Sequence, residues 1–238
     1  MVGGKRAVIE SLRAGRVREL LVSEGARHNQ GIREVEAAAS AAGVRARRVP
    51  RAELDALAAD HRGVVARVER PRDLGERDVV SFPFTEDAVV VTLDGVVDPQ
   101  NLGAAARSAD AAGVAVLITR THRSAGVTDS AFRASAGALV SLPHARVANL
   151  PRVLERLRDA GFVVVGLDPE ATRSIYEEPC PRGRVALVVG SEGTGLSRLV
   201  RERCDLLISL PMLGHVASLN VAAGLAAALF AWIVPSRA

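Results

Sequence analysis

Two hydrophobic periodicities alternate along this chain. From residue 88 onward, unbroken apolar runs are separated by segments in which apolar positions recur every three or four residues. Unbroken runs are typical of parallel strands buried on both faces, and the wider spacing is typical of the connecting helices. We therefore predict a doubly wound α/β domain. Its predicted strands are 88–93, 114–119, 162–167, 185–190 and 206–210, with a short extra strand at 138–142, and its predicted helices are 101–112, 130–135, 150–160, 197–203 and 220–234.

The first third of the chain has the same alternation on a smaller scale. Residues 70–87 then interrupt it with prolines and mixed charges, which is typical of a linker. We predict a small α/β unit over residues 1–69, a linker over 70–87 and a larger domain over 88–238. In the first unit the predicted strands are 17–22, 44–49 and 64–68, and the predicted helices are 7–12, 31–42 and 51–59.

Composition narrows the function classes. The 238 residues carry a formal charge of +4 and a pI of about 9.9, which favours polyanionic partners such as nucleic acids. The longest apolar run falls short of the roughly 20 residues of a membrane span. Two cysteines and five scattered histidines show no zinc-ligand or catalytic-triad spacing. We expect a cytoplasmic protein with no membrane segment and no metal site.

A first motif, residues 93–114, places the turn Asp98–Asn101 before a helix. Asn101 is predicted to be the N-cap of that helix. Gly103 and Arg107 are one helical turn apart, and the bare surface at Gly103 would let Arg107 lie back toward the helix start, where backbone N–H groups favour an anion. This arrangement suits a phosphate or ribose, although Arg107 is equally compatible with a solvated position on an ordinary helix.

A second motif, residues 185–197, places Gly190-Ser191-Glu192-Gly193-Thr194-Gly195 directly after a buried strand. Ligands of open α/β sheets bind at this end of the strands. The glycine spacing is GxxGxG, which is neither the dinucleotide fingerprint nor the phosphate-binding loop of nucleotide hydrolases. A nicotinamide-dependent oxidoreductase is therefore disfavoured. Glu192 either orients a substrate or is a solvated turn carboxylate.

A third motif, residues 207–230, contains Leu210-Pro211-Met212 at a strand end and Ser218-Leu219-Asn220 at the start of an alanine-rich helix with Gly224. Small residues in that helix permit close backbone packing. The alternative reading of this motif is simply a buried C-terminal helix.

Taken in order, the segments DPQNLGAAARSADAAGV, VVGSEGTGLS and LPM…SLNVAAG resemble the three signature motifs of the SpoU (TrmH) family of RNA ribose 2′-O-methyltransferases, within the SPOUT superfamily. The opening GKRAVIESLRAG and the stretch RSAGVTDSAFRASAGA are similar to the RlmB-type branch, which methylates guanosines of large-subunit rRNA. HRGVVARV departs from that branch at Arg62, where it usually has glutamine.

The resemblance implies a deep trefoil knot in the C-terminal domain and a ribosomal-protein-like N-terminal domain that captures RNA. It implies a homodimer that uses S-adenosylmethionine to methylate 23S rRNA. By the same resemblance, Arg107 acts as base or as phosphate and alkoxide stabiliser, and Asn101, Glu192 and Asn220 organise the catalytic site. The residues implied to hold the cofactor are Gly190, Leu210, Leu219, Gly195 and Met212.

Several functions remain open at this point. The three motifs are equally compatible with a tRNA ribose methylase or with a ribosome-directed antibiotic-resistance methylase. A catalytically silent RNA-binding or assembly factor is the alternative from a different class, and the joint presence of Asn101, Arg107, Glu192 and Asn220 argues against it. The target nucleotide is not written in the sequence.

Overall fold

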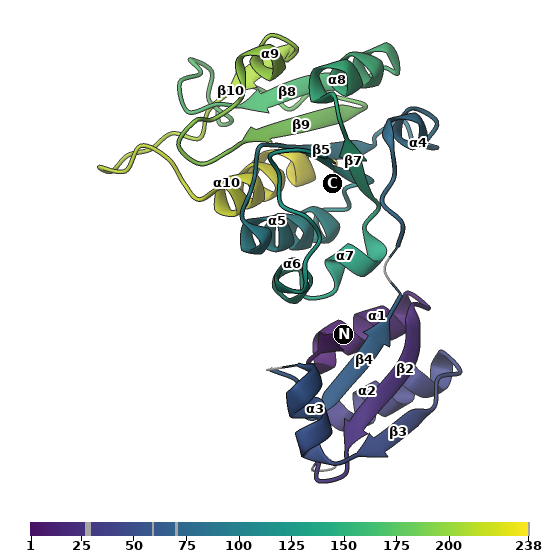
Figure 1. Cartoon of the computed structure of the whole chain (residues 1–238). Helices are drawn as coiled ribbons and strands as arrows, with labels where there is room; N and C mark the ends of the chain where they lie inside the picture. Colours follow the sequence, from purple (N-terminus) through teal and green to yellow (C-terminus); the bar gives the residue numbers. More distant parts are fainter. Residues whose placement is uncertain (27–29, 59, 70, 238) are drawn as a thin grey trace.

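The computed structural model describes residues 1–26, 30–58, 60–69 and 71–237, which form two α/β units (Figure 1). The predicted end of the helix at residue 59 and the first residue of the predicted linker, residue 70, lie outside the described residues, as does His28.

The first unit is a four-stranded sheet in the order β1-β4-β2-β3, in which only β2 and β3 are parallel. Helices α1 and α2 cover one face through Val8, Leu12, Ile32 and Val35. Helix α3 covers the other face, where Leu54 is fully buried. The elements are β1 Val2–Gly3, α1 Lys5–Arg13, β2 Val17–Ser23, α2 Gln30–Ala41, β3 Ala46–Val49, α3 Arg51–Leu57 and β4 Val64–Val68.

The second unit is a parallel six-stranded sheet in the order β10-β8-β9-β5-β6-β7. Alternate residues of β5 and β9 enter two separate apolar clusters, so these strands are buried on both faces, as their unbroken apolar runs predict. The strands are β5 Val89–Asp94, β6 Val116–Arg120, β7 His144–Val147, β8 Val163–Leu167, β9 Val185–Gly190 and β10 Leu206–Ile208.

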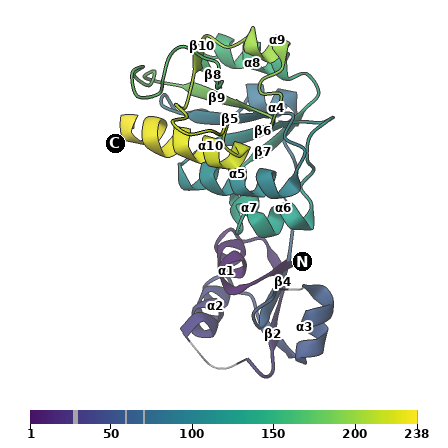
Figure 2. The same ribbon diagram turned by 90° about the vertical axis from the view of Figure 1, so that its left-hand side faces the viewer.

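Helices cover both faces of this sheet, and Figures 1 and 2 show them as two outer layers. One layer comprises α5 Pro99–Ala111, α6 Asp129–Ala134, α7 Ala138–Ser141 and α10 Val221–Ala228. The other comprises α4 Glu76–Val80, α8 Leu150–Asp159 and α9 Arg198–Arg201. The prediction of an α/β fold with a parallel sheet is confirmed.

The strand predicted at 138–142 is wrong. Residues 138–141 form the short helix α7, which begins after Gly137 in the left-handed region at φ 100°. Leu139 and Val140 are adjacent yet both are buried in the same apolar cluster, which a helical turn permits and an alternating strand does not. The edge strand β7 follows instead, and its four residues include His144 and Arg146, so no apolar run marks it.

Much of the predicted linker packs on the second sheet. Leu74 forms a parallel bridge with Ala145 of β7, with its N–H 2.8 Å from the His144 carbonyl oxygen. Asp73 lies 2.9 Å from His144 Nδ1, and this hydrogen bond holds the pKa of Asp73 below its ordinary value. The segment therefore covers the free edge of β7, which would otherwise expose unpaired backbone groups.

The two units contact each other through apolar and small residues. Val2 is buried in the same cluster as Phe132 and Leu139 of the second unit. Gly137 lies against α1, since a Cβ built there would be 3.1 Å from the Glu10 Cβ. In both views α6 and α7 lie between α5 and α1 (Figures 1 and 2).

The predicted C-terminal helix is continuous but changes its winding. Helix α10 passes into a π-helical turn, Leu229–Ile233, and a 3₁₀ turn, Val234–Ser236. Trp232 is only 5% exposed, and its Nε1 donates a 2.7 Å hydrogen bond to the Glu178 carbonyl oxygen. Among the described residues, no helix is both long and apolar enough to cross a membrane.

Candidate active site

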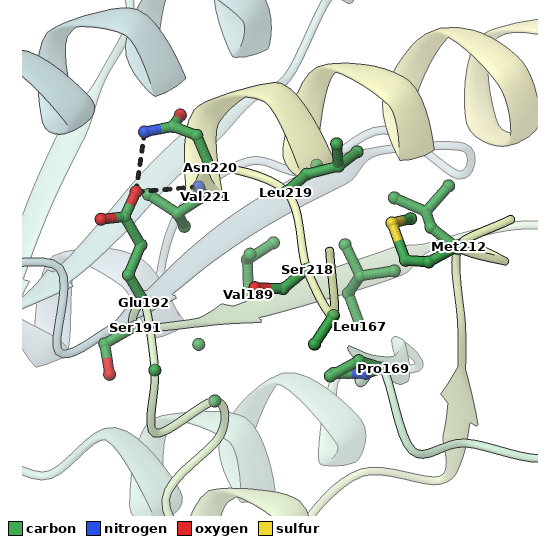
Figure 3. Close-up of a pocket in the computed structure, with 16 residues that line it drawn as sticks. Leu167, Pro169, Val189, Ser191, Glu192, Met212, Ser218, Leu219, Asn220 and Val221 are labelled. Carbon is green, nitrogen blue, oxygen red and sulfur yellow. Dashed lines mark hydrogen bonds between the residues drawn. The ribbon is translucent and has the colours of Figure 1, made fainter. Parts of the chain in front are cut away.

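All three motifs converge where the parallel strands end. Asp94, the last residue of β5, pairs in register with Gly190, the last residue of β9. The loops that follow these two strands and the segment that follows β10 meet beside the start of α10 (Figure 3). The sequence placed the candidate site at this edge of the sheet, and the structure brings the motifs together there.

The loop after β9 is closed on itself. Ser191 and Gly195 exchange two backbone hydrogen bonds of 3.1 and 3.0 Å. A Cβ built at Gly190 would lie 2.1 Å from the carbonyl carbon of Gly195, so only glycine permits this closure. Gly193 and Gly195 have φ values of 84° and 63°, in the region that glycine adopts without strain.

Glu192 is the centre of a hydrogen-bond network that joins the three motifs. Its Oε1 atom accepts from Asn220 Nδ2 at 2.7 Å, from Asn101 Nδ2 at 3.2 Å and from the backbone N–H of Val221 at 3.3 Å. Asn220 Nδ2 also donates to Asn101 Oδ1 at 2.9 Å. Figure 3 shows the Asn220 and Val221 contacts converging on the Glu192 carboxylate. Three of the four predicted catalytic residues are therefore in direct contact.

The N-cap of α5 is Asp98, not Asn101. Asp98 Oδ1 accepts a 2.9 Å hydrogen bond from the Gln100 N–H, which leaves Asn101 inside the first turn. The side chain of Asn101 is thereby free to reach Glu192. Asn220 is the N-cap of a different helix, α10. Its Oδ1 accepts from the N–H groups of Ala222 and Ala223.

Gly103 does not leave a bare surface for Arg107. It is buried against α6, where an added Cβ would lie 2.3 Å from the Ala131 carbonyl oxygen, so its role is close helix packing. Residues two apart on a helix point to nearly opposite sides, so Asn101 faces away from Gly103. Arg107 lies one turn beyond Gly103 on the α6 side, is exposed, and forms no side-chain hydrogen bond or ion pair with any described residue.

Sequence reasoning missed the buried carboxylate that fixes this edge. Asp94 is 3% exposed, pairs with Arg120 Nε at 3.0 Å and accepts a 2.7 Å hydrogen bond from the Ser197 N–H. It therefore anchors the second motif to β5 and β6. The sequence signal that could have revealed it is the position of Asp94, a charged residue at the end of the otherwise largely apolar strand β5.

The converging segments enclose a cavity of about 300 Å³, at the lower end of the range for small-molecule sites. Every residue predicted to hold a cofactor lines it, whereas Asn101 and Arg107 do not. The walls combine apolar side chains with the bare backbone of the glycine loop. Among the lining residues are Gly190, Gly195, Leu210, Met212, Leu219 and Glu192.

The charge of this cavity restricts its ligand. Glu192 is the only charged side chain among the lining residues, and it is acidic. Dinucleotide sites place a G-x-G-x-x-G turn against the pyrophosphate, whereas this loop has GxxGxG spacing and the cavity has no cationic lining side chain. A ligand with an adenosyl group and a sulfonium cation fits the apolar walls and the single carboxylate.

Other catalytic chemistries find no support at this site. Burial raises the pKa of the Cys204 thiol to about 12, so it is not a nucleophile at neutral pH. His61 and His144 are buried and hydrogen-bonded to Asp55 and Asp73. Within the part of the chain that the structure describes, no three His, Cys, Asp or Glu residues are grouped to hold a metal ion.

The fold and the cavity define the class of α/β proteins that bind a small cofactor at the carboxyl ends of parallel strands, with a loop unlike that of dinucleotide enzymes. Comparison with known proteins agrees. The model of the SpoU rRNA methylase family matches residues 88–231, and the model described as RNA 2′-O ribose methyltransferase substrate binding matches residues 1–74. The chain belongs to the SpoU rRNA methylase family.

Individual relatives are similar over most of their length. The 23S rRNA (guanosine-2′-O-)-methyltransferase RlmB of Salmonella typhi is 44% identical over 171 residues, which are 71% of this chain and 70% of that protein. An uncharacterised tRNA/rRNA methyltransferase of Mycolicibacterium vanbaalenii is 41% identical over 232 residues, 94% of this chain and 73% of that protein.

A solved structure extends the likeness to the whole fold. The SpoU methyltransferase AviRb from Streptomyces viridochromogenes, in complex with the cofactor AdoMet, has a TM-score of 0.79 and 33% identity. The match covers 99% of this chain and 89% of that chain. The predicted family and cofactor are thus confirmed.

Proposed function

We propose that this protein transfers a methyl group from S-adenosylmethionine to the ribose 2′-hydroxyl of a guanosine in 23S rRNA. The observation that carries the proposal is the hydrogen-bond network of Asn101, Glu192 and Asn220 beside a cavity that no cationic side chain lines. The names of the RlmB relatives and the matched substrate-binding region support the choice of rRNA.

Each element of the site has a defined role in this proposal. Gly190, Gly195, Leu210, Met212 and Leu219 hold the cofactor through backbone groups and apolar contact. When bound, S-adenosylmethionine supplies an electrophilic methyl group carried by a sulfonium. Asn101, Glu192 and Asn220 fix the relative positions of α5, the glycine loop and α10, so that the reacting atoms are held in line.

Arg107 acts on the RNA in this proposal. A guanidinium stays protonated at neutral pH and is a poor base, so its contributions are to position a phosphate and to stabilise negative charge developing on the 2′-oxygen. An exposed side chain that bonds to no described residue is available for both roles.

We propose further that the protein is a homodimer in which Arg107 serves the cavity of the partner subunit. Arg107 does not line the cavity of its own chain, which supports delivery in trans. Apolar side chains exposed in the third motif and after α10 support an interface there, namely Leu213, Val216, Leu219 and Phe230.

Light scattering at micromolar concentration is expected to give twice the chain mass of 25.0 kDa. Replacing exposed apolar residues of this surface, as in Leu213→Asp with Phe230→Asp, is expected to give monomers, because two charges cannot be desolvated at an apolar contact. A matched change at exposed Tyr176, Tyr176→Asp, should leave the mass unchanged. A stable wild-type monomer with full activity would contradict the dimer.

The domain division at residues 70–87 and the trefoil knot belong to the same proposal. The family-model match to residues 1–74 supports an RNA-capturing first domain, and membership of the family supports a knotted second domain.

The proposed function predicts a specific pattern of binding and transfer. Calorimetry should detect binding of S-adenosylmethionine and none of NAD, because the cavity has no cation for a pyrophosphate. Tritium from labelled cofactor should enter 23S rRNA but not tRNA, with one ribose methylated. Transfer to tRNA alone would replace the substrate assignment, and NAD binding without S-adenosylmethionine binding would overturn the function.

A further inference from the structure

The arginines of the first unit divide into those with a carboxylate partner and those without one. Exposed ion pairs of this kind contribute little to stability, but they do neutralise charge. Arg6, Arg16, Arg33 and Arg45 are exposed and form no side-chain bond with a described residue, and among them Arg6 lies on α1, the helix next to α7. The arginines that pair with glutamate or aspartate are Arg13, Arg18, Arg47, Arg48, Arg51, Arg62 and Arg67.

The second unit has further exposed arginines that form no side-chain bond with a described residue. Arg107, Arg123 and Arg133 belong to α5, to the loop after β6 and to α6, in the layer that contacts the first unit. The others, Arg77, Arg152, Arg156 and Arg182, lie on α4, on α8 and in the segment before β9. Helices α5 and α6 are in close contact, since an added Cβ at Gly103 would lie 2.6 Å from the Ala134 Cβ.

The loop that carries Arg123 is held to the active-site edge. Ala125 N–H and Ser124 Oγ donate to the Val96 carbonyl oxygen at 2.7 and 3.2 Å, and Val96 lies just before α5. Arg123 itself has φ 54°, a conformation that a non-glycine residue keeps only where its surroundings impose it. The loop is therefore preorganised rather than shaped by a ligand.

Helix α6 also connects this surface to the first unit. It lies beside β1, and α7 lies against α1, where Gly137 contacts Ala7 and Glu10. Arg6 is one helical turn before Glu10, so it lies near this junction. Figures 1 and 2 both place α6 and α7 between α5 and α1.

We propose that an unpaired strand of the substrate RNA binds with its phosphates along a basic track formed by Arg6, Arg133, Arg123 and Arg107, from the first unit to the reacting ribose. This inference rests on the proposed function. Arginine guanidinium groups that are not paired with carboxylates can bind phosphate through two parallel N–H donors. The exposed Tyr176 and Phe230 lie on other elements, so the track is assigned to the phosphate backbone of the RNA.

The test uses the full-length protein and a labelled single-stranded oligoribonucleotide, titrated at several salt concentrations. Arg6→Ala, Arg123→Ala and Arg133→Ala should each weaken binding roughly three- to tenfold and lower the salt slope by about 0.7, as expected for one lost single-strand phosphate contact. Arg133→Lys should retain most of the slope, because it retains the charge. Arg156→Ala is the matched control, since Arg156 is exposed on α8, on the opposite face of the sheet.

Cofactor affinity, measured on the same samples, should be unchanged in all variants, which separates a track residue from a structural one. If the wild type methylates RNA but the three track variants match Arg156→Ala in affinity and slope, the basic track is overturned and the proposed function stands. If the wild type binds S-adenosylmethionine and transfers no methyl group to any RNA, the proposed function itself fails.

Discussion

Arg107→Ala is expected to lower the rate of methyl transfer by on the order of 10²–10³ while leaving folding and cofactor affinity nearly intact. The side chain contributes no hydrogen bond or ion pair to the described structure, and it does not line the cofactor cavity. Under the proposed role, its removal is therefore expected to affect only the contact with the RNA and the developing oxyanion. Single-turnover transfer to rRNA, with calorimetry of S-adenosylmethionine on the same preparation, measures the two effects separately.

Two variants test the interpretation of this result. Arg107→Lys should not restore the rate, because lysine lacks the planar fork that positions a phosphate. Arg156→Ala, which removes another exposed arginine from α8, should behave as wild type. Near-normal turnover of purified Arg107→Ala would refute the role assigned to the residue.

Gly190→Ala is expected to weaken S-adenosylmethionine binding by at least about 100-fold. The new methyl group would lie 2.1 Å from the backbone of Gly195, a distance that no side-chain rotation relieves, so the loop that walls the cavity must open. Calorimetry measures the loss, and far-ultraviolet circular dichroism checks that the sheet is retained.

Gly161→Ala is the matched control, because Gly161 also has a positive φ but does not line the cavity. A Cβ at Gly161 meets no atom within 4 Å, so its cost is the strain of φ 86°, roughly 1–2 kcal/mol, and cofactor affinity should be retained. Wild-type affinity in Gly190→Ala would contradict the account of the loop.

The sequence predicted the second sheet well because its strands are buried on both faces and therefore appear as unbroken apolar runs. It failed at residues 138–147, where a helical turn and a strand of four residues are too short to show a period. Burial of Leu139 and Val140 in one cluster depends on α5 and α1 packing beside them, which a local pattern does not contain.

The candidate site was predictable in its location and not in its internal contacts. Three loops after parallel strands must meet at one edge, so the convergence of Asn101, Glu192 and Asn220 follows from fold class and family resemblance together. The helix caps are local, since Asp98 and Asn220 each accept from N–H groups two or three residues further along the chain. The hydrogen bonds of Asn101 with Glu192 and of Asp94 with Ser197 join distant segments, so no local sequence pattern contains them.

The docking of Trp232 gives this protein a built-in optical reporter. It is the chain's single tryptophan, and its indole is buried with Nε1 bound to Glu178 in the crossover between β8 and β9. Nearly all intrinsic emission excited at the red edge of absorption thus originates at the end of the last helix. Release of that helix shifts the emission to longer wavelength, while melting of the first unit, which contains no tryptophan, leaves the signal unchanged. An unmodified sample therefore distinguishes the unfolding of one unit from that of the other.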